Sequence, residues 1–173
     1  MSALYFFDTS GVFSAMLPAV MAHELGHVIA LRICGARVTR LRLGIEGLSM
    51  DYAGALSHLA DSFCALMGPI FGAVFAILTS MLGNRLDSGY LLCVSGVSAV
   101  LSAFNLLPVP ALDGGRALSA VLPEKISVVL GMLVGCVLLL SGLYCAVKGY
   151  GLALLPAGAW TLVCTWRWKP QER

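Results

Sequence analysis

The stretch MAHELGHVIA, residues 21–30, places Glu24 between two histidines, His23 and His27. Residues four apart lie on the same face of an α-helix, about 6 Å from one another, so both imidazoles project the same way with Glu24 beside them. The pattern H-E-x-x-H supplies two nitrogen ligands to a zinc ion and leaves the glutamate free to act as a base on a water molecule. The alternative is a pair of histidines that are only hydrogen-bonded inside a helix bundle.

The composition places this motif in a membrane. Of the 173 residues, 59% are hydrophobic and 12% are charged, whereas about a quarter of the residues of soluble domains are charged. An acidic side chain in the middle of a membrane-spanning helix costs about 2.5 to 3.5 kcal/mol on insertion scales. Glu24 therefore needs a role that offsets this cost, which favours a functional carboxyl group over a structural one.

A catalytic zinc site usually has three protein ligands, so the two histidines need a partner. The best candidate is Asp113, in the stretch FNLLPVPALDGGRAL. Pro108 and Pro110 remove backbone donors and the glycines after Asp113 allow unusual dihedral angles, so we expect a helix to unwind here and to aim Asp113 inward. The alternatives for Asp113 are an N-cap for a helix beginning near Arg116 and an ion pair with Arg116 itself.

The polar connection after the first apolar segment carries other groups that could bind a metal ion. Acidic residues in such a connection are ordinarily solvated, and a lone histidine near a membrane surface is usually a polar surface group. We therefore expect no ligand among Glu46, Asp51 and Asp61, and we expect His58 to be a polar surface group, with an accessory metal ligand as the alternative.

Five long segments are uncharged, apart from Glu24 in the first, and each is long enough to cross a bilayer core of about 30 Å, which needs about 20 residues. These segments are 9–31, 62–82, 88–112, 126–147 and 149–166. We predict an all-α polytopic membrane protein with about five transmembrane helices and a single transmembrane domain over residues 1–173, with a three-helix core in 9–122 and accessory helices in 123–168. The N-terminus lacks the basic region and cleavage site of a signal peptide, so we expect the first span to be retained.

The basic residues indicate how these spans are oriented. If the spans alternate, nine of the eleven basic residues fall on one face of the membrane, and Arg85 and Lys148 on the other. The positive-inside rule makes the richer face cytoplasmic, which puts the N-terminus outside. Glu24 lies about 12 Å from the cytoplasmic boundary marked by Arg32, so the site is expected nearer the cytoplasm of a multi-pass cell-membrane protein. Since topology explains the basic residues, nucleic-acid binding is not expected.

The connection between the first two spans predicts strands. In RVTRLRLGIEGLSMDYAGAL, residues 37–56, arginines alternate with apolar residues, which is typical of a strand, and Glu46 with Gly47 can turn the chain into a second strand over residues 48–52. We predict a small β-hairpin at the membrane surface, whose free edge can pair with an extended peptide. The alternative is a covering loop with arginines that face the membrane.

Together these motifs resemble the site-2 protease family of intramembrane zinc metalloproteases, and more narrowly its small bacterial branch that contains the sporulation-factor processing enzymes. The resemblance covers residues 17–118. It rests on HELGH at residues 23–27, on Gly68 with Pro69 in the second span, and on the pattern N-x-x-P-x-x-x-L-D-G from Asn105 to Gly114.

The resemblance implies that His23, His27 and Asp113 bind Zn²⁺, that Glu24 is the catalytic base, and that Asn105 binds substrate near the scissile carbonyl. The expected protein is an intramembrane zinc metalloprotease, one transmembrane protease domain that hydrolyses a peptide bond in or near a transmembrane segment of a membrane-protein substrate. Its expected partners are that substrate, the lipid bilayer and a regulatory membrane partner. Many family members have an asparagine where this chain has Gly72, so no polar substrate contact is assigned there.

Two other functions compete with this one. A catalytically inactive metal-binding membrane protein, or a partner subunit, would keep both histidines but would have no task for Glu24. A purely structural membrane subunit would leave the histidines, Glu24 and Asp113 as coincidences.

Overall fold

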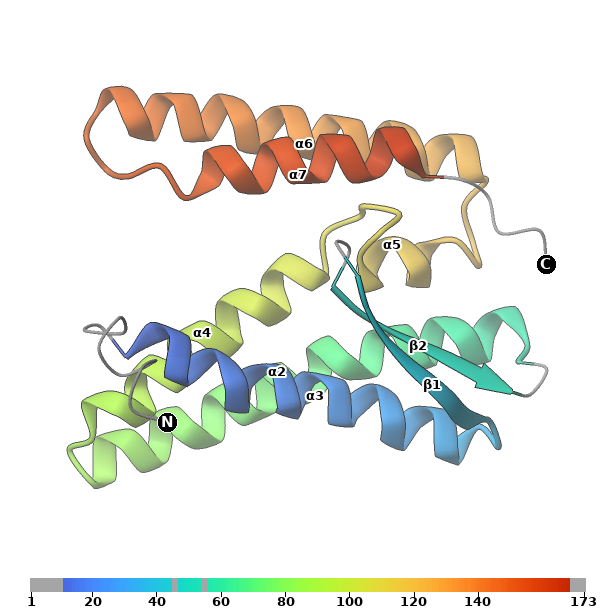
Figure 1. Cartoon of the computed structure of the whole chain (residues 1–173), viewed down its shortest axis with the longest axis horizontal. Helices are drawn as coiled ribbons and strands as arrows, with labels where there is room; N and C mark the ends of the chain where they lie inside the picture. The colour runs from blue at the N-terminus through green and yellow to red at the C-terminus, as the bar shows by residue number, and fades with distance from the viewer. Residues whose placement is uncertain (1–10, 45–46, 54–55, 169–173) are drawn as a thin grey trace.

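The computed structural model describes residues 11–44, 47–53 and 56–168. In chain order the elements are α2 (Val12–Ile33), β1 (Arg37–Gly44), β2 (Gly47–Ala53), α3 (His58–Arg85), α4 (Gly89–Asn105), α5 (Asp113–Leu118), α6 (Glu124–Val147) and α7 (Leu154–Arg167). Figure 1 shows that α2, α3 and α4 form one bundle and that α6 and α7 lie side by side as a separate pair. The short helix α5 packs on α3 and contacts α6, so it joins the two parts.

Small residues hold the three-helix bundle together. Lipid gives packed helices little hydrophobic driving force, so helices associate in membranes through close contact of small side chains. The buried residues of each helix recur at intervals of mostly three or four and are mostly small: Ala15, Ala19, His23, Gly26 and Ala30 in α2, Ala65, Gly68, Gly72 and Ala76 in α3, and Val94, Ser98 and Ser102 in α4. His23 lies within the stripe of α2, and it therefore points into the bundle.

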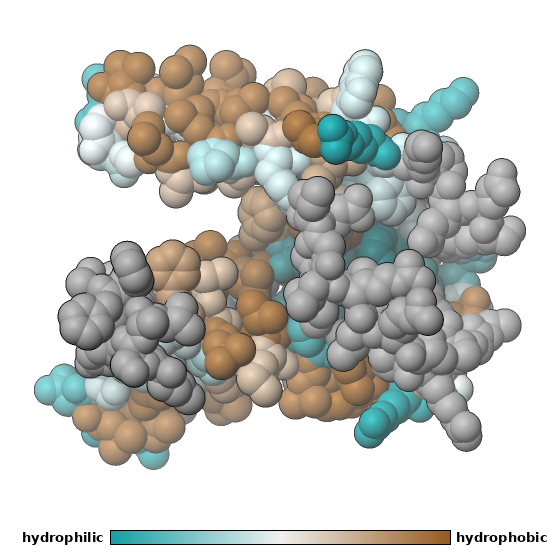
Figure 2. Space-filling model, in the orientation of Figure 1, coloured by the Kyte–Doolittle hydropathy of each residue, from teal (hydrophilic) through white to brown (hydrophobic). Residues whose placement is uncertain are grey.

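The outer faces of the helices are apolar. Figure 2 shows hydrophobic side chains over much of both the bundle and the α6–α7 pair. Large side chains such as Leu17 of α2, Val100 of α4 and Leu140 of α6 are exposed. Exposed apolar surface of this extent is unfavourable in water and suits contact with lipid.

Three helices of the described residues are long and apolar enough to cross a membrane, namely α2, α3 and residues Lys125–Val147 of α6. The helical membrane fold is thus confirmed, whereas the expected five crossings stay a prediction. The helix α4 has 17 residues, because it ends before Pro108, and α7 has 14. The helix α7 begins only at Leu154. The turn after α6 contains Gly149 and Gly151 at positive φ, 75° and 121°, which is not the backbone conformation of an α-helix.

The connection between α2 and α3 forms two antiparallel strands. Arg37 of β1 lies opposite Ala53 of β2, and Gly44 lies opposite Gly47, with an irregularity between Val38 and Arg40. The expected second strand, residues 48–52, lies within β2, while Glu46 of the expected turn is outside the described residues. The strand β1 contacts α2, and Figure 1 shows the hairpin at the end of the bundle where α5 lies. Its association with the membrane surface stays a prediction.

Replacing Gly158 should separate α6 from α7. A Cβ atom at Gly158 would lie 2.7 Å from the backbone nitrogen of Leu139 on α6, where no flexible side chain can move aside. We expect Gly158→Ala to cost about 1 to 3 kcal/mol through overpacking, measured as a lower thermal unfolding midpoint of the detergent-solubilised protein. Gly96→Ala in α4 is the matched control, because a Cβ there meets no atom within 4 Å. Equal midpoints for the two variants would contradict this packing of α6 on α7.

Candidate metal centre

The helical spacing of α2 brings the two histidines of the HELGH motif together. His23 and His27 are one helical turn apart, and their Nε2 atoms lie 3.2 Å from each other. The two rings meet edge to face, with centroids 4.9 Å apart. His23 is 4% exposed, so its polar ring is removed from solvent and needs polar partners inside the bundle.

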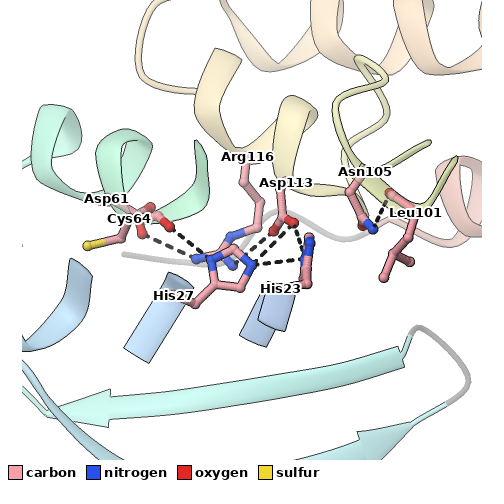
Figure 3. A network of polar contacts seen from close by, with 8 residues as sticks. All are labelled: His23, His27, Asp61, Cys64, Leu101, Asn105, Asp113 and Arg116. Carbon is pink, nitrogen blue, oxygen red and sulfur yellow. Dashed lines mark hydrogen bonds and ion pairs between the residues drawn. The ribbon is translucent and has the colours of Figure 1, made fainter. Parts of the chain in front are cut away.

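Asp113 reaches the histidines because the chain unwinds after α4. Residues 106–112 are not helical, and the folded-back chain packs so closely that a Cβ at Gly114 or Gly115 would collide with the carbonyl oxygens of Leu106 or Val109. The helix α5 then begins at Asp113, and its N-cap residue is Leu112, which excludes the N-cap role considered for Asp113. The buried Asp113 side chain points toward both histidines (Figure 3).

The three side chains form a ligand set that fits a metal ion. Oδ2 of Asp113 lies 3.0 Å from Nε2 of His23 and 3.3 Å from Nε2 of His27. Tetrahedral zinc with bonds of about 2.0 to 2.1 Å holds its ligand atoms about 3.3 Å apart. The observed separations are close to this value, and the three residues are the group in the described chain whose ligand atoms, all within 4.8 Å, could hold a metal. Binding of the ion by these residues stays a prediction.

The backbone of α3 fixes the tautomer of His27. Nδ1 of His27 lies 2.9 Å from the carbonyl oxygen of Cys64 and can donate its hydrogen there. This bond leaves the lone pair of Nε2 free for a metal, as in many metal sites where the second ring nitrogen donates to a carbonyl. Gly68, one turn further along α3, leaves room for the ring, since a Cβ at this position would collide with Nε2 of His27.

An ion-pair chain holds the second oxygen of Asp113. Nη1 of Arg116 lies 4.0 Å from Oδ1 of Asp113, and Nη2 of Arg116 lies 3.3 Å from Oδ1 of Asp61 at the start of α3. The contact with Arg116, considered above as an alternative role for Asp113, therefore exists together with the contacts to the histidines (Figure 3). Asp61, expected to be solvated, is instead tied to Arg116, because α5 folds back over the first turn of α3.

The carboxyl group of Asp113 is in the form that a ligand requires. It belongs to α5, which is outside the candidate spans. Burial raises the pKa of Asp113, but hydrogen bonds and charge from His23 and His27 together lower it further, and the resulting pKa is about 2. The group is therefore ionised at neutral pH, as a metal-binding carboxylate is.

The other predicted residues lie around this cluster. Glu24 is half-buried, and the charges of both histidines, Asp113 and Arg116 act on its carboxyl group, although it is not among the ligand atoms. Asn105 ends α4, and its Nδ2 donates to the carbonyl oxygen of Leu101, 3.0 Å away. His58 is exposed at the start of α3 and is not part of the cluster.

Two acidic residues of the polar connection cannot be placed. Glu46 and the side chain of Asp51 lie outside the described residues.

Sequence reasoning missed the supports of the cluster. The Cys64 carbonyl is a backbone group and leaves no signal in the sequence. Arg116, which contacts Asp113, also binds Asp61, 55 positions earlier in the chain. The only signal for this contact in the sequence is that charged residues are few, so that each is expected to have a partner. Gly68 was noted as part of a motif, but its steric role follows only from the packing of α3 against α2.

Comparison with known proteins finds relatives in sequence and in fold. No family model matches the chain. It is 28% identical over 120 residues to a zinc metalloprotease of Methanocaldococcus jannaschii, and 28% identical over 130 residues to a protein of Mycobacterium tuberculosis named "putative zinc metalloprotease Rip3". These matches cover 66% and 70% of the chain but 35% and 33% of the relatives, so the chain spans about a third of the length of the curated relatives it matches.

The same fold occurs in a solved structure. The site-2 protease from Methanocaldococcus jannaschii superposes with a TM-score of 0.72 at 20% sequence identity, over 99% of this chain and 86% of that one. The chain therefore has the fold of this site-2 protease. The narrower sporulation-factor branch is not tested by these matches.

Removing the carboxylate ligand should abolish tight metal binding. We expect the purified protein to hold about one zinc per chain and Asp113→Asn to lose affinity by more than the roughly 10- to 100-fold that outer-shell changes cost. The amide is neutral and cannot replace the charged ligand. Zinc per chain and chelator competition measure this, with Asp87→Asn, an exposed carboxylate elsewhere, as the matched control. Full zinc content in Asp113→Asn would move the third ligand to another residue.

Filling the space beside His27 should disturb the same site from a different helix. Because a Cβ at Gly68 would collide with the His27 ring, we expect Gly68→Ala to turn the imidazole away and to weaken zinc binding by about 10- to 100-fold. Competition titration measures the affinity, and far-UV circular dichroism checks that the helices persist. Gly96→Ala again serves as the control. Unchanged affinity in Gly68→Ala would show that the ring does not occupy this space.

Proposed function

We propose that the chain is an intramembrane zinc metalloprotease of the site-2 protease type, which hydrolyses a peptide bond in or near a transmembrane segment of a membrane-protein substrate. The observation that carries this proposal is the convergence of His23, His27 and Asp113 within a membrane bundle, with Glu24 beside them. The names of the relatives, which both contain the words zinc metalloprotease, support zinc as the metal.

Each residue of the site has a separate role in the proposed hydrolysis. Zn²⁺ held by His23, His27 and Asp113 would supply a Lewis acid that polarises the scissile carbonyl and makes a water molecule more acidic. Glu24 takes a proton from the attacking water and passes it to the leaving amine nitrogen. Arg116 and Asp61 hold the carboxylate of Asp113 in place, which keeps the ligand geometry fixed while the proton moves.

Asn105 is proposed to bind the substrate. It is the last residue of α4, directly before the unwound residues 106–112 that lead to Asp113, and Figure 3 draws both side chains. One hydrogen of its Nδ2 is donated to Leu101, and an amide nitrogen carries a second hydrogen, which can be donated to a substrate carbonyl. The bond to Leu101 fixes the orientation of the amide before substrate arrives.

The substrate is proposed to arrive from the lipid. Figure 2 shows an open notch between the α6–α7 pair and the bundle, with largely apolar side chains on both walls. An apolar helical segment suits such a surface, and the hairpin edge can pair with the segment once it unwinds. The ring contact between Phe104 of α4 and Trp160 of α7, with centroids 6.0 Å apart, is one of the links across the two walls. The α6–α7 pair is also the proposed surface for a regulatory membrane partner.

We further propose that all five apolar segments cross the cell membrane, with the N-terminus outside and the site nearer the cytoplasm. Figure 1 shows the ends of α2 and α7, the start of α6 and all of α5 at one end of the molecule. Among the described helices, this end carries the basic residues Arg32, Arg116, Lys125 and Arg167, and the opposite end carries Arg85 and Lys148. This asymmetry supports the orientation through the positive-inside rule.

Replacing the proposed base separates a protease from an inactive metal-binding protein. In Glu24→Gln the amide can no longer accept the proton of the attacking water, so we expect proteolysis to fall by at least about 100-fold. Zinc content should stay near that of the wild type, because Glu24 is not a ligand. The measurement is cleavage of a candidate transmembrane substrate co-reconstituted in liposomes, together with zinc per chain.

The matched control is Asp87→Asn, which makes the same carboxyl-to-amide change at an exposed position between α3 and α4. Cleavage that survives in Glu24→Gln would contradict the assignment of the base. A wild-type protein that binds zinc but cleaves no membrane substrate would favour the metal-binding alternative.

A further inference from the structure

The two histidines of the cluster differ in what holds their second ring nitrogen. Nδ1 of His27 is paired with the Cys64 carbonyl oxygen at 2.9 Å. Nδ1 of His23 is buried and has no hydrogen-bond partner. His23 is nevertheless the more deeply buried of the two rings. The ring of His23 therefore lacks the second hydrogen bond that holds the ring of His27.

An unpaired nitrogen at this place is costly. A buried donor without an acceptor loses about 1 to 3 kcal/mol. When Nε2 of His23 binds a metal ion, the hydrogen of the ring must sit on Nδ1, and histidine ligands almost always donate that hydrogen to a carboxylate, a carbonyl or a water. The structure should therefore place an acceptor within a small movement of Nδ1.

Ser102 of α4 offers such an acceptor. A Cβ built on Gly72 of α3 would lie 3.8 Å from Nδ1 of His23 and would collide with Oγ of Ser102, so the ring nitrogen and the hydroxyl face the same small space. Ser102 is 3% exposed. Its hydroxyl donates to the carbonyl oxygen of Ser98, 2.8 Å away. Since a hydroxyl has one hydrogen and two lone pairs, this bond leaves Oγ free to accept.

We propose that Ser102 is the positioning residue of His23: in the metal-loaded protein its Oγ accepts the Nδ1 hydrogen of His23 and relays the bond to the carbonyl oxygen of Ser98. This relay fixes the tautomer and ring direction of His23, as the Cys64 carbonyl does for His27. The inference rests on the metal site of the proposed function.

The proposal also explains Gly72. Any side chain at this position would push Oγ of Ser102 away from the ring, because its Cβ would collide with that oxygen. Many family members have an asparagine at the position of Gly72. In this chain a glycine there leaves the space that the hydroxyl of Ser102 on α4 occupies. Gly72 and Ser102 thus form one unit on facing helices.

The test compares Ser102→Ala with Ser95→Ala in the full-length, detergent-solubilised protein. Both changes remove a serine hydroxyl from α4, and the hydroxyl of Ser95 donates to the Ala76 carbonyl oxygen at 2.7 Å, away from the cluster. We expect Ser102→Ala to weaken zinc binding by about 10- to 100-fold and Ser95→Ala to leave it within about twofold of wild type. Chelator competition gives the affinity, and the visible spectrum of the cobalt-substituted protein reports a change in ligand geometry.

A measurement on the wild type keeps the proposal testable if Ser102→Ala does not fold. In zinc-loaded protein with ¹⁵N-labelled histidine, the Nδ1 hydrogen of His23 should exchange slowly with water and show a nuclear Overhauser effect to the β hydrogens of Ser102. Rapid exchange without that effect would overturn the proposal and make water the partner. Equal zinc affinity in wild type and Ser102→Ala would also overturn it, whereas a wild type that binds no zinc would overturn the proposed function instead.

Discussion

The structure depends on one constraint: polar side chains placed inside an apolar bundle must satisfy one another. His23, His27 and Asp113 are brought within 4.8 Å by two segments that are 90 residues apart. None of these groups is favourable there alone, because a buried polar group without partners costs several kcal/mol and a buried charge costs more. The cluster therefore requires α2 and α5 to lie where they do, and a metal ion is the partner that suits two imidazoles and a carboxylate.

Glycine and other small residues make this convergence sterically feasible. The helices α2 and α3 approach so closely at Gly26 that a Cβ would collide with the carbonyl oxygen of Met67. Gly68 leaves space for the His27 ring, and Gly72 leaves space for Ser102 beside His23. In a membrane, such close approach also supplies the packing that associates the helices. The same small residues thus stabilise the bundle and shape the cluster of His23, His27 and Asp113, so few of them can change without affecting both.

The two parts of the chain contribute unequally to the site. Every residue of the cluster and its supports comes from α2, α3, α4 or α5, and none of these described contacts comes from α6 or α7. The α6–α7 pair is joined to the bundle mainly through α5 and the segment before it, where Gly131 of α6 packs against Pro110. This arrangement leaves the notch between the two parts open to apolar surroundings, while the bundle keeps the polar cluster fixed.

The sequence by itself determined the membrane class, the apolar segments, the pairing of His23 with His27 and the nomination of Asp113, because these follow from composition, from helical spacing and from the cost of charge in lipid. Tertiary structure decided the rest. Asp61 binds Arg116, α4 ends at Asn105, α7 begins only at Leu154, and Cys64 supports His27 through its backbone. Such features depend on which helices meet and at what depth, and a linear pattern records the face of a helix but not the neighbour that covers it.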